Sequence, residues 1–288
     1  MTPKYALLEA AVSCGSPFPG SETAFRAIAP RLEAMLGPER VALYPMELRT
    51  PCTTYPADLI CLDTVVSVAE ELRGNWLAAY AKGEFPVTIG GDHSVAMGTL
   101  AAAGETFGAD DLALIYIDAH TDINTIESSE SHRIHGMDLA EALGLTLPRL
   151  KVGRNDVDLY GENIHFIGPR SVDAPEWGIM DRAGCHCHTG KEVRERGVNA
   201  VVEEVLRAVQ GKKVAISFDV DVLNPSTFRA TGYNVPGGLV PIEVENALLT
   251  FFRETDVVCF ECVEYSPAKD TDGRDLETLL GILETVLK

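Results

Sequence analysis

The stretch that decides the fold is Ile115-Tyr116-Ile117-Asp118-Ala119-His120-Thr121-Asp122. The apolar, β-branched run over 112–117 predicts a buried strand, which ends in three potential metal ligands spaced two residues apart. Side chains two apart in extended backbone point the same way, so we expect Asp118, His120 and Asp122 to converge. Two carboxylates and an imidazole suit a divalent cation, whereas the alternative for such a pattern in isolation is a solvated polar turn.

Strand-like and helix-like segments alternate along almost the whole chain on either side of this stretch. Strands are expected at 5–12, 40–44, 85–89, 112–117, 164–167, 184–188, 213–220 and 257–263. Such alternation predicts an α/β protein with a mostly parallel sheet covered by helices on both faces. Because no repeat or linker divides the sequence, we expect a single catalytic domain over residues 1–288.

The composition argues against two classes of binding partner. The net charge is −19, from 43 acidic and 24 basic residues, which argues against nucleic acid and anionic membranes as partners. No apolar run approaches the roughly 18 residues of a spanning helix, and the N-terminus lacks the layout of a secretory signal, so we expect a cytoplasmic protein. Seven cysteines, an odd number, favour reduced thiols over a disulfide framework.

Ligand-type residues follow four of the expected strands. Binding crevices in open α/β sheets lie outside the carboxyl ends of strands, so these residues are expected to meet in one place. They are His93, Asp118, His120, Asp122, Asp219, Asp221 and Glu264. Two divalent cations would balance the four aspartates and hold a bridging water of lowered pKa. Oxygen-rich ligation with one imidazole per metal favours Mn²⁺ over Zn²⁺, with Fe²⁺ or Co²⁺ as alternatives.

At this point the sequence resembles the ureohydrolases, the family of arginase and agmatinase. The resemblance extends from Gly20 to the C-terminus and is carried by Gly90–Ser94, Asp118–Asp122, His135–Met137, Ser217–Asp221 and Glu264–Pro267. It implies a three-layer αβα fold with a single eight-stranded, mostly parallel sheet. It also implies a two-Mn²⁺ enzyme that cleaves a small cationic guanidino substrate to urea plus an amine, assembled as a homo-oligomer (trimer or hexamer).

The resemblance implies a role for each motif residue. One metal would be held by His93, Asp118, Asp122 and Asp219. The other would be held by His120, Asp118, Asp219 and Asp221. A metal-bridging hydroxide would attack the guanidinium carbon, with Asp122 orienting it and accepting its proton. Glu264 would pair with the guanidinium, and His135 would shuttle a proton to the leaving amine, as suits an imidazole near neutral pH.

The substrate is predicted from residues that the resemblance places around it. Contacts to arginine are implied for Asn124, Ser131 and Asp173, and Thr231 lies in a loop behind the metals. Arg133 departs from the asparagine usual in arginases. Its guanidinium could grip a carboxylate, which favours arginine or a related guanidino acid over agmatine.

Several alternatives stay open from the sequence. Arg133 could instead face solvent or pair with Glu127 or Glu130. The protein could be an agmatinase, or a family member that keeps metals without catalysis. A one-zinc deacetylase of the same fold is disfavoured by the full set of four aspartates and two histidines.

A second group of ligand-type residues, Cys185-His186-Cys187-His188, looks like a metal box. Period-2 alternation along a strand would put the cysteines on one face and the histidines on the other. The four side chains would then not converge, and we expect no metal there.

Overall fold

The computed structural model describes residues 4–146, 148–154 and 158–288, and within these ranges eight strands form one sheet. The strands are β1 (Tyr5–Glu9), β2 (Val41–Tyr44), β3 (Phe85–Ile89), β4 (Leu112–Ile117), β5 (Ile164–Ile167), β6 (His186–His188), β7 (Lys213–Asp219) and β8 (Asp256–Val263). Their spatial order is β2-β1-β3-β8-β7-β4-β5-β6, and every neighbouring pair is parallel. The predicted eight-stranded parallel sheet is confirmed.

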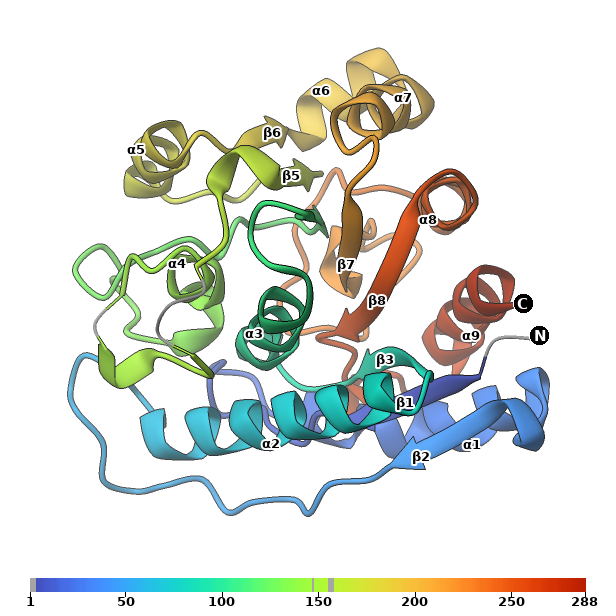
Figure 1. Cartoon of the computed structure of the whole chain (residues 1–288), viewed down its shortest axis with the longest axis horizontal. Coiled ribbons are helices and arrows are strands. Elements are labelled where there is room, and N and C mark those ends of the chain that lie inside the picture. Colours follow the sequence, from blue (N-terminus) through green and yellow to red (C-terminus); the bar gives the residue numbers. More distant parts are fainter. Residues whose placement is uncertain (1–3, 147, 155–157) are drawn as a thin grey trace.

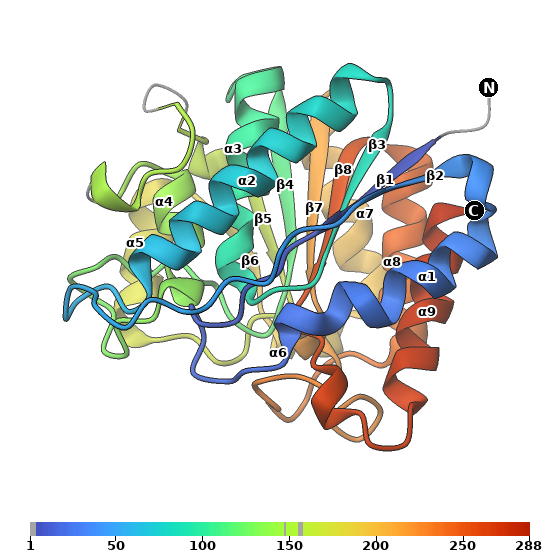
Figure 2. The same ribbon diagram turned by 90° about the horizontal axis from the view of Figure 1, so that it is seen from below.

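Helices cover both faces of the sheet (Figures 1 and 2). One face is covered by α1 (Ala24–Leu36), α6 (Gly190–Arg196), α7 (Val198–Ala208), α8 (Pro241–Glu254) and α9 (Arg274–Leu287). The other is covered by α2 (Leu62–Ala81), α3 (Ala96–Phe107), α4 (Asp138–Ala142) and α5 (Ala174–Ala183). The three-layer αβα architecture is therefore as expected. None of the helices in the described ranges is long and apolar enough to cross a membrane.

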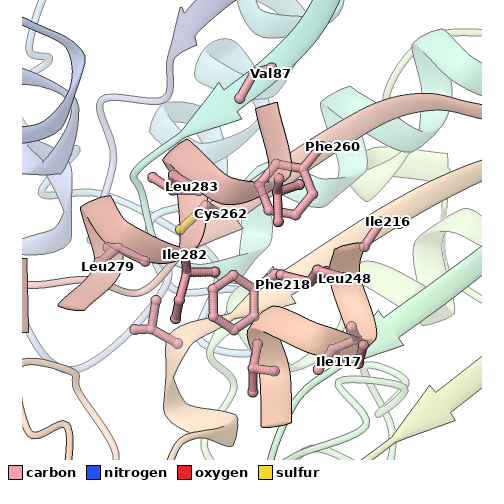
Figure 3. Close-up of a cluster of buried hydrophobic side chains, with 14 of the residues drawn as sticks. Val87, Ile117, Ile216, Phe218, Leu248, Phe260, Cys262, Leu279, Ile282 and Leu283 are labelled. Atoms are coloured by element: carbon pink, nitrogen blue, oxygen red, sulfur yellow. The ribbon is translucent and has the colours of Figure 1, made fainter. Parts of the chain in front are cut away.

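Each face carries its own hydrophobic core because side chains alternate along the strands. In β4, Ile115 and Ile117 point into one core, whereas Leu114 and Tyr116 point into the other. Figure 3 shows part of the first core, where Phe218 of β7 lies near helix residues such as Leu248. Burial on both faces explains why the central strands are nearly continuous apolar runs.

Four expected strands are shorter than predicted, and one of them, β2, begins at Val41 rather than at residue 40. β1 ends at Glu9 rather than at residue 12, β7 ends at Asp219, and β6 begins only at His186. At the last boundary Gly184 adopts a left-handed conformation, with φ 79°, and caps α5. Cys185 then donates its N–H to the Met180 carbonyl, so these residues end the helix instead of starting the strand.

The strand order decides where the polar strand ends lie. The four strands followed by candidate ligands, β3, β8, β7 and β4, are consecutive neighbours in the middle of the sheet. Since all four are parallel, their carboxyl ends open at one edge. This arrangement brings together segments that are up to 171 residues apart in the sequence, as between His93 and Glu264.

Candidate metal centre

The same local turn follows three of the central strands. In each, an aspartate carboxylate accepts the backbone N–H two residues ahead: Asp118 from His120 at 2.7 Å, Asp219 from Asp221 at 2.7 Å, and Asp92 from Ser94 at 3.2 Å. Such turns redirect the chain as soon as the strand ends. β4 stops at Ile117, so the expectation that extended backbone aligns Asp118 with His120 and Asp122 is wrong. The three side chains converge because the turn bends the backbone directly after the strand.

Two site residues have left-handed backbone that non-glycine residues rarely adopt. Asp122 has φ 44° and Glu264 has φ 65°. Strain of this kind costs about 1–3 kcal/mol and persists where the surrounding structure enforces it, often at functional sites. For Glu264 the enforcing contacts are visible: its N–H donates to the Gly91 carbonyl at 3.0 Å, and its carboxylate accepts the His93 N–H at 3.1 Å.

The first cluster is centred on His93, which is fully buried. Its Nδ1 lies 3.0 Å from an Asp118 oxygen, 3.2 Å from an Asp122 oxygen and 3.2 Å from an Asp219 oxygen. Ligand atoms around a cation with bonds of about 2.1 Å are themselves about 3 Å apart, so these groups fit one metal ion. Apart from this contact with the imidazole, the Asp118 oxygen concerned, Oδ2, is buried without a hydrogen-bond partner, as a metal ligand would be.

The second cluster is centred on His120 and uses the other oxygen of Asp118. His120 Nδ1 lies 3.0 Å from an Asp221 oxygen and 3.4 Å from Asp118 Oδ1. Ligand atoms of His93, Asp118 and Asp122, and separately of Asp118, His120 and Asp221, lie within 4.8 Å of one another. The structure thus brings all six predicted ligands together in two clusters that share Asp118. This donor set fits two divalent cations.

The carboxylates and imidazoles of the clusters shift one another's pKa values. Burial raises the pKa of Asp219, and the charges of Asp221 and Asp118 raise it further. Burial acts against ionisation of Asp118 too, but hydrogen bonds with His120 and His93 outweigh it and hold the pKa below its usual value. Burial lowers the pKa of His93, yet its three aspartate partners outweigh that and raise it. In the cation-free protein, protons on the imidazoles therefore offset the carboxylates, and metals would displace them.

A hydrogen-bond relay on the far side of His93 fixes the orientation of the imidazole. His93 Nε2 lies 2.8 Å from the Ser217 hydroxyl, which donates to Glu261 at 2.6 Å. Since the Ser217 hydrogen is used on Glu261, the hydroxyl oxygen accepts from Nε2–H, and Nδ1 is left as the ligand nitrogen. Glu261 was not predicted from the sequence, because a glutamate within an apolar strand carries no motif.

A cavity of about 220 Å³ lies against the two clusters. It is lined by His120, Asp122, Asn124, Ser129, Ser131, His135, Gly136, Ser171, Asp173, Glu176, Asp219, Asp221, Tyr233 and Glu264. Three of the residues implied to contact substrate are among them: Asn124, Ser131 and Asp173. Asn124 Nδ2 donates to Asp173 at 3.0 Å, so these two act as one polar unit.

Two predicted substrate residues are not among those that line the cavity. Arg133 directs its guanidinium at the backbone, donating to the Cys14 carbonyl at 3.3 Å and the Ser16 carbonyl at 3.4 Å. Thr231 is buried, and its hydroxyl has no hydrogen-bond partner. The argument that Arg133 selects a carboxylate-bearing substrate therefore loses its geometric basis.

His135 is held in one tautomer by the loop that Arg133 supports. Its Nδ1 lies 2.9 Å from the Gly15 carbonyl, which can only accept, so Nδ1 carries the hydrogen and Nε2 is left to exchange protons. Tyr233 stacks on this ring, with centroids 5.8 Å apart and an interplanar angle of 11°. No sequence signal pointed to Tyr233, which lies in an irregular loop.

Glu176 is a further cavity residue that was not predicted from the sequence. It is buried, accepts the N–H of Ile123 at 3.2 Å and that of Asp173 at 2.7 Å, and its burial raises its pKa to about 7. The spacing Asp173-x-x-Glu176 is a capping-box pattern, and the structure forms that box at the start of α5. The pattern could have revealed Glu176.

The chain is similar to known proteins along nearly its whole length. The profile of the Arginase family matches residues 4–286. An arginase of Bacillus subtilis (strain 168) is 32% identical over 234 residues, which cover 78% of this chain and 76% of that protein. The solved structure of arginase from Bacillus caldovelox superimposes with a TM-score of 0.90 at 27% identity, covering 100% of this chain and 98% of that one. The chain therefore belongs to the arginase family of metal-dependent ureohydrolases.

Proposed function

We propose that the protein hydrolyses the guanidino group of arginine, or of a related guanidino acid, to urea plus an amine, with two Mn²⁺ per chain. The observation that carries this proposal is the pair of histidine–carboxylate clusters that share Asp118 at a cavity also lined by Glu264. Oxygen-rich ligation with a single imidazole in each cluster supports Mn²⁺, with Fe²⁺ and Co²⁺ as alternatives.

The cations, when bound, would lower the pKa of a water molecule to near neutrality and so supply the nucleophile. Asp122, whose carboxylate lines the cavity, would accept a proton there. Buried Glu264 pairs with the guanidinium and holds its central carbon over the clusters. His135 protonates the departing amine from Nε2, because Nδ1 is committed to the Gly15 carbonyl.

The far part of the cavity supports a substrate with both an ammonium and a carboxylate. Asp173 would attract the α-ammonium of arginine, while the Ser131 hydroxyl and the Asn124 amide would donate to its α-carboxylate. Relatives that carry the name arginase support the same substrate. Agmatine is the second candidate, since Arg133 binds backbone carbonyls and adds no positive charge to the residues that line the cavity.

Other expectations from the sequence stay predictions. These are the trimeric or hexameric assembly, the cytoplasmic location and the single catalytic domain. Thr231, which does not line the cavity, is proposed only to support the loop that carries Tyr233.

Urea release from the Mn²⁺-loaded protein tests the proposal, with arginine, agmatine and 4-guanidinobutyrate compared at equal concentrations. We expect the highest kcat/KM with arginine. Glu264→Gln is the matched variant: it should retain two metals and lose at least about a hundredfold in kcat/KM, because the charge opposite the guanidinium is gone. Hydrolysis of agmatine alone would replace arginine as the substrate. Absence of urea from all three compounds would point to a non-catalytic family member.

A further inference from the structure

Tyr233 links the two histidines that line the cavity. It belongs to the irregular loop between β7 and α8, and it lines the cavity itself. Its ring lies parallel to that of His135, with centroids 5.8 Å apart and an interplanar angle of 11°, which is an offset stacking arrangement. It meets the ring of His120 edge-on, with centroids 5.3 Å apart. The proposed reaction gives Tyr233 no role.

His135 is anchored to the Gly15 carbonyl oxygen, which lies 2.9 Å from its Nδ1 and 3.4 Å from its backbone nitrogen. A hydrogen bond at Nδ1 fixes the position of that atom, but it leaves the imidazole free to tilt about the bond and to carry Nε2 with it. A flat ring stacked on the face of the imidazole removes this freedom, because stacking favours parallel planes. The hydrogen bond and the Tyr233 ring together therefore determine where Nε2 lies.

Tyr233 is itself held in place by residues from other segments of the chain. Phe18 packs against its ring at an interplanar angle of 85°, with centroids 4.9 Å apart. The Lys269 ammonium lies 4.7 Å from the centroid of the Phe18 ring. The same ammonium donates to the carbonyls of Thr231 at 2.7 Å and Gly232 at 3.2 Å, the two residues before Tyr233. Because these contacts do not involve His135, Tyr233 is a fixed support for that ring and does not depend on it.

We propose that Tyr233 is a positioning residue whose ring holds the imidazole of His135, so that Nε2 reaches the leaving nitrogen of the substrate. The proposal rests on the proposed function and adds to it the residue that orients the proton donor. A proton donor acts only within hydrogen-bond reach of the atom that it protonates, so a small displacement of the imidazole slows the reaction. Loss of the Tyr233 ring should therefore lower kcat and leave KM nearly unchanged.

The first test compares two substitutions of Tyr233 in the full-length, Mn²⁺-loaded protein, with the guanidino compound that the wild type hydrolyses fastest. Tyr233→Leu keeps apolar bulk and removes the flat ring, so kcat should fall about tenfold to a hundredfold while KM stays within about threefold. Tyr233→Phe keeps the ring and should stay within about threefold of the wild type in both constants. Tyr160→Leu is the matched control and should not change either constant, because Tyr160 is exposed and is not among the residues that line the cavity.

A double-mutant cycle tests whether Tyr233 acts through His135. His135→Asn removes the imidazole and should itself lower kcat about a hundredfold or more. If the Tyr233 ring serves only to hold that imidazole, adding Tyr233→Leu to His135→Asn should lower kcat by less than about twofold. Equal effects of Tyr233→Leu in the presence and absence of His135 would overturn the proposal.

A measurement without turnover checks the stacking directly. In the metal-free, full-length protein, the Cε1–H resonance of His135 can be observed by NMR and assigned by its loss in His135→Asn. The ring current of a stacked aromatic side chain shifts this proton upfield. The shift should be present in the wild type and in Tyr233→Phe, and it should be lost in Tyr233→Leu. The same chemical shift in all three proteins would overturn the proposal.

Metal content separates this role from one exerted through His120, which Tyr233 also contacts. Tyr233→Leu should bind as many Mn²⁺ ions per chain as the wild type, and fewer bound ions would overturn the proposal. A higher KM with unchanged kcat would show that Tyr233 contacts the substrate instead, and would overturn it too. If Tyr233→Leu does not fold, Phe18→Leu removes the ring that holds Tyr233 and should give a smaller loss of kcat with the same dependence on His135.

The outcomes also distinguish this inference from the proposed function. If the wild type releases urea and His135→Asn is impaired, but Tyr233→Leu is fully active, this inference alone fails. If His135→Asn is fully active, the proposed role of His135 fails together with it. If the wild type releases no urea from any guanidino compound, the proposed function itself fails.

Discussion

Two strand ends of this protein carry similar ligand-type residues and differ completely in what those residues do. After β4, Asp118, His120 and Asp122 converge on the candidate metal centre. At β6, Cys185–His188 stay separated by the alternation of a strand. The cysteines pack against the core on the α5 side, whereas His188 Nδ1 lies 3.5 Å from Glu192 of α6 on the other side. The prediction that the cysteines lie on one side and the histidines on the other is confirmed, although only His186, Cys187 and His188 belong to the strand and Cys185 ends α5.

Ligand-type residues form a metal site only where the backbone brings their side chains together. β6 has a third histidine beside it, because His165 of β5 stacks on His186 with ring centroids 4.7 Å apart. Yet in the part of the chain that the structure describes, the groups whose ligand atoms gather within 4.8 Å are the two clusters after β4. There an aspartate turn ends the strand and bends the chain, and further carboxylates arrive from β7.

The largest effect is expected for a change of Asp118, at the strand end whose ligands converge. Asp118→Asn removes the carboxylate that both clusters share, so bound Mn²⁺ should fall below two per chain and urea release should drop at least about a thousandfold. Metal analysis after desalting and a urea assay measure both. Asp181→Asn, an exposed aspartate on α5, is the control and should behave as the wild type does. Retention of two metals by Asp118→Asn would break the contrast between the two strand ends.

A middle-sized effect is expected at the other strand end, in the dependence of stability on pH. Burial lowers the pKa of His165 to about 4, and the charges of His186 and His188 lower it further. The unfolded chain, with an ordinary histidine pKa near 6.5, binds this proton more readily, so wild-type stability should fall as pH falls from about 6.5 to 4. His165→Gln should lose about 2 kcal/mol less than the wild type between pH 7 and pH 4.5.

Urea unfolding at the two pH values measures this difference, and comparing variants under identical conditions cancels contributions from the metal centre. His186→Gln should change the pH slope by a smaller amount, because burial is the larger cause of the shift at His165. Parallel pH profiles for His165→Gln and the wild type would show that this imidazole is not held neutral by burial.

The smallest effect is expected for the two cysteines at β6. Cys185→Ser combined with Cys187→Ser should retain two Mn²⁺ per chain and keep urea release within about twofold of the wild type, since neither thiol contributes to the clusters. Elemental analysis and the urea assay check this. Loss of one metal per chain in the double variant would contradict the assignment of β6 as a structural strand.

Local chemistry explains which features could be predicted from the sequence. Apolar runs identified the central strands, because burial on both faces demands them, whereas the edge strand β6 has the sequence His-Cys-His and carries no such run. The ligands were identified because carboxylates and imidazoles directly after a buried strand are unusual in a purely structural role. Boundaries were less accurate, as at His186, where a left-handed glycine two residues earlier decides where the strand begins.

The substrate residues were predicted less well because side-chain direction in a loop is set by distant partners. Arg133 turns to the carbonyls of Cys14 and Ser16, which are more than 100 residues away in sequence. Tyr233 enters the cavity from another loop, and Phe18 packs on it edge to face at 4.9 Å. Neither the direction of Arg133 nor the position of Tyr233 can be predicted from the spacing of nearby residues in the sequence.

By itself the sequence determined the αβ alternation, the ligand types and the family resemblance, because these depend on period, turn chemistry and residue identity. Only the tertiary structure decided that β3, β8, β7 and β4 are neighbours, so that His93 lies 3.0 Å from Asp118 and 3.2 Å from Asp219. It also decided that Asp138 lies buried behind them. The physical reason is that strand order and burial arise from packing of the whole chain, which no short segment encodes.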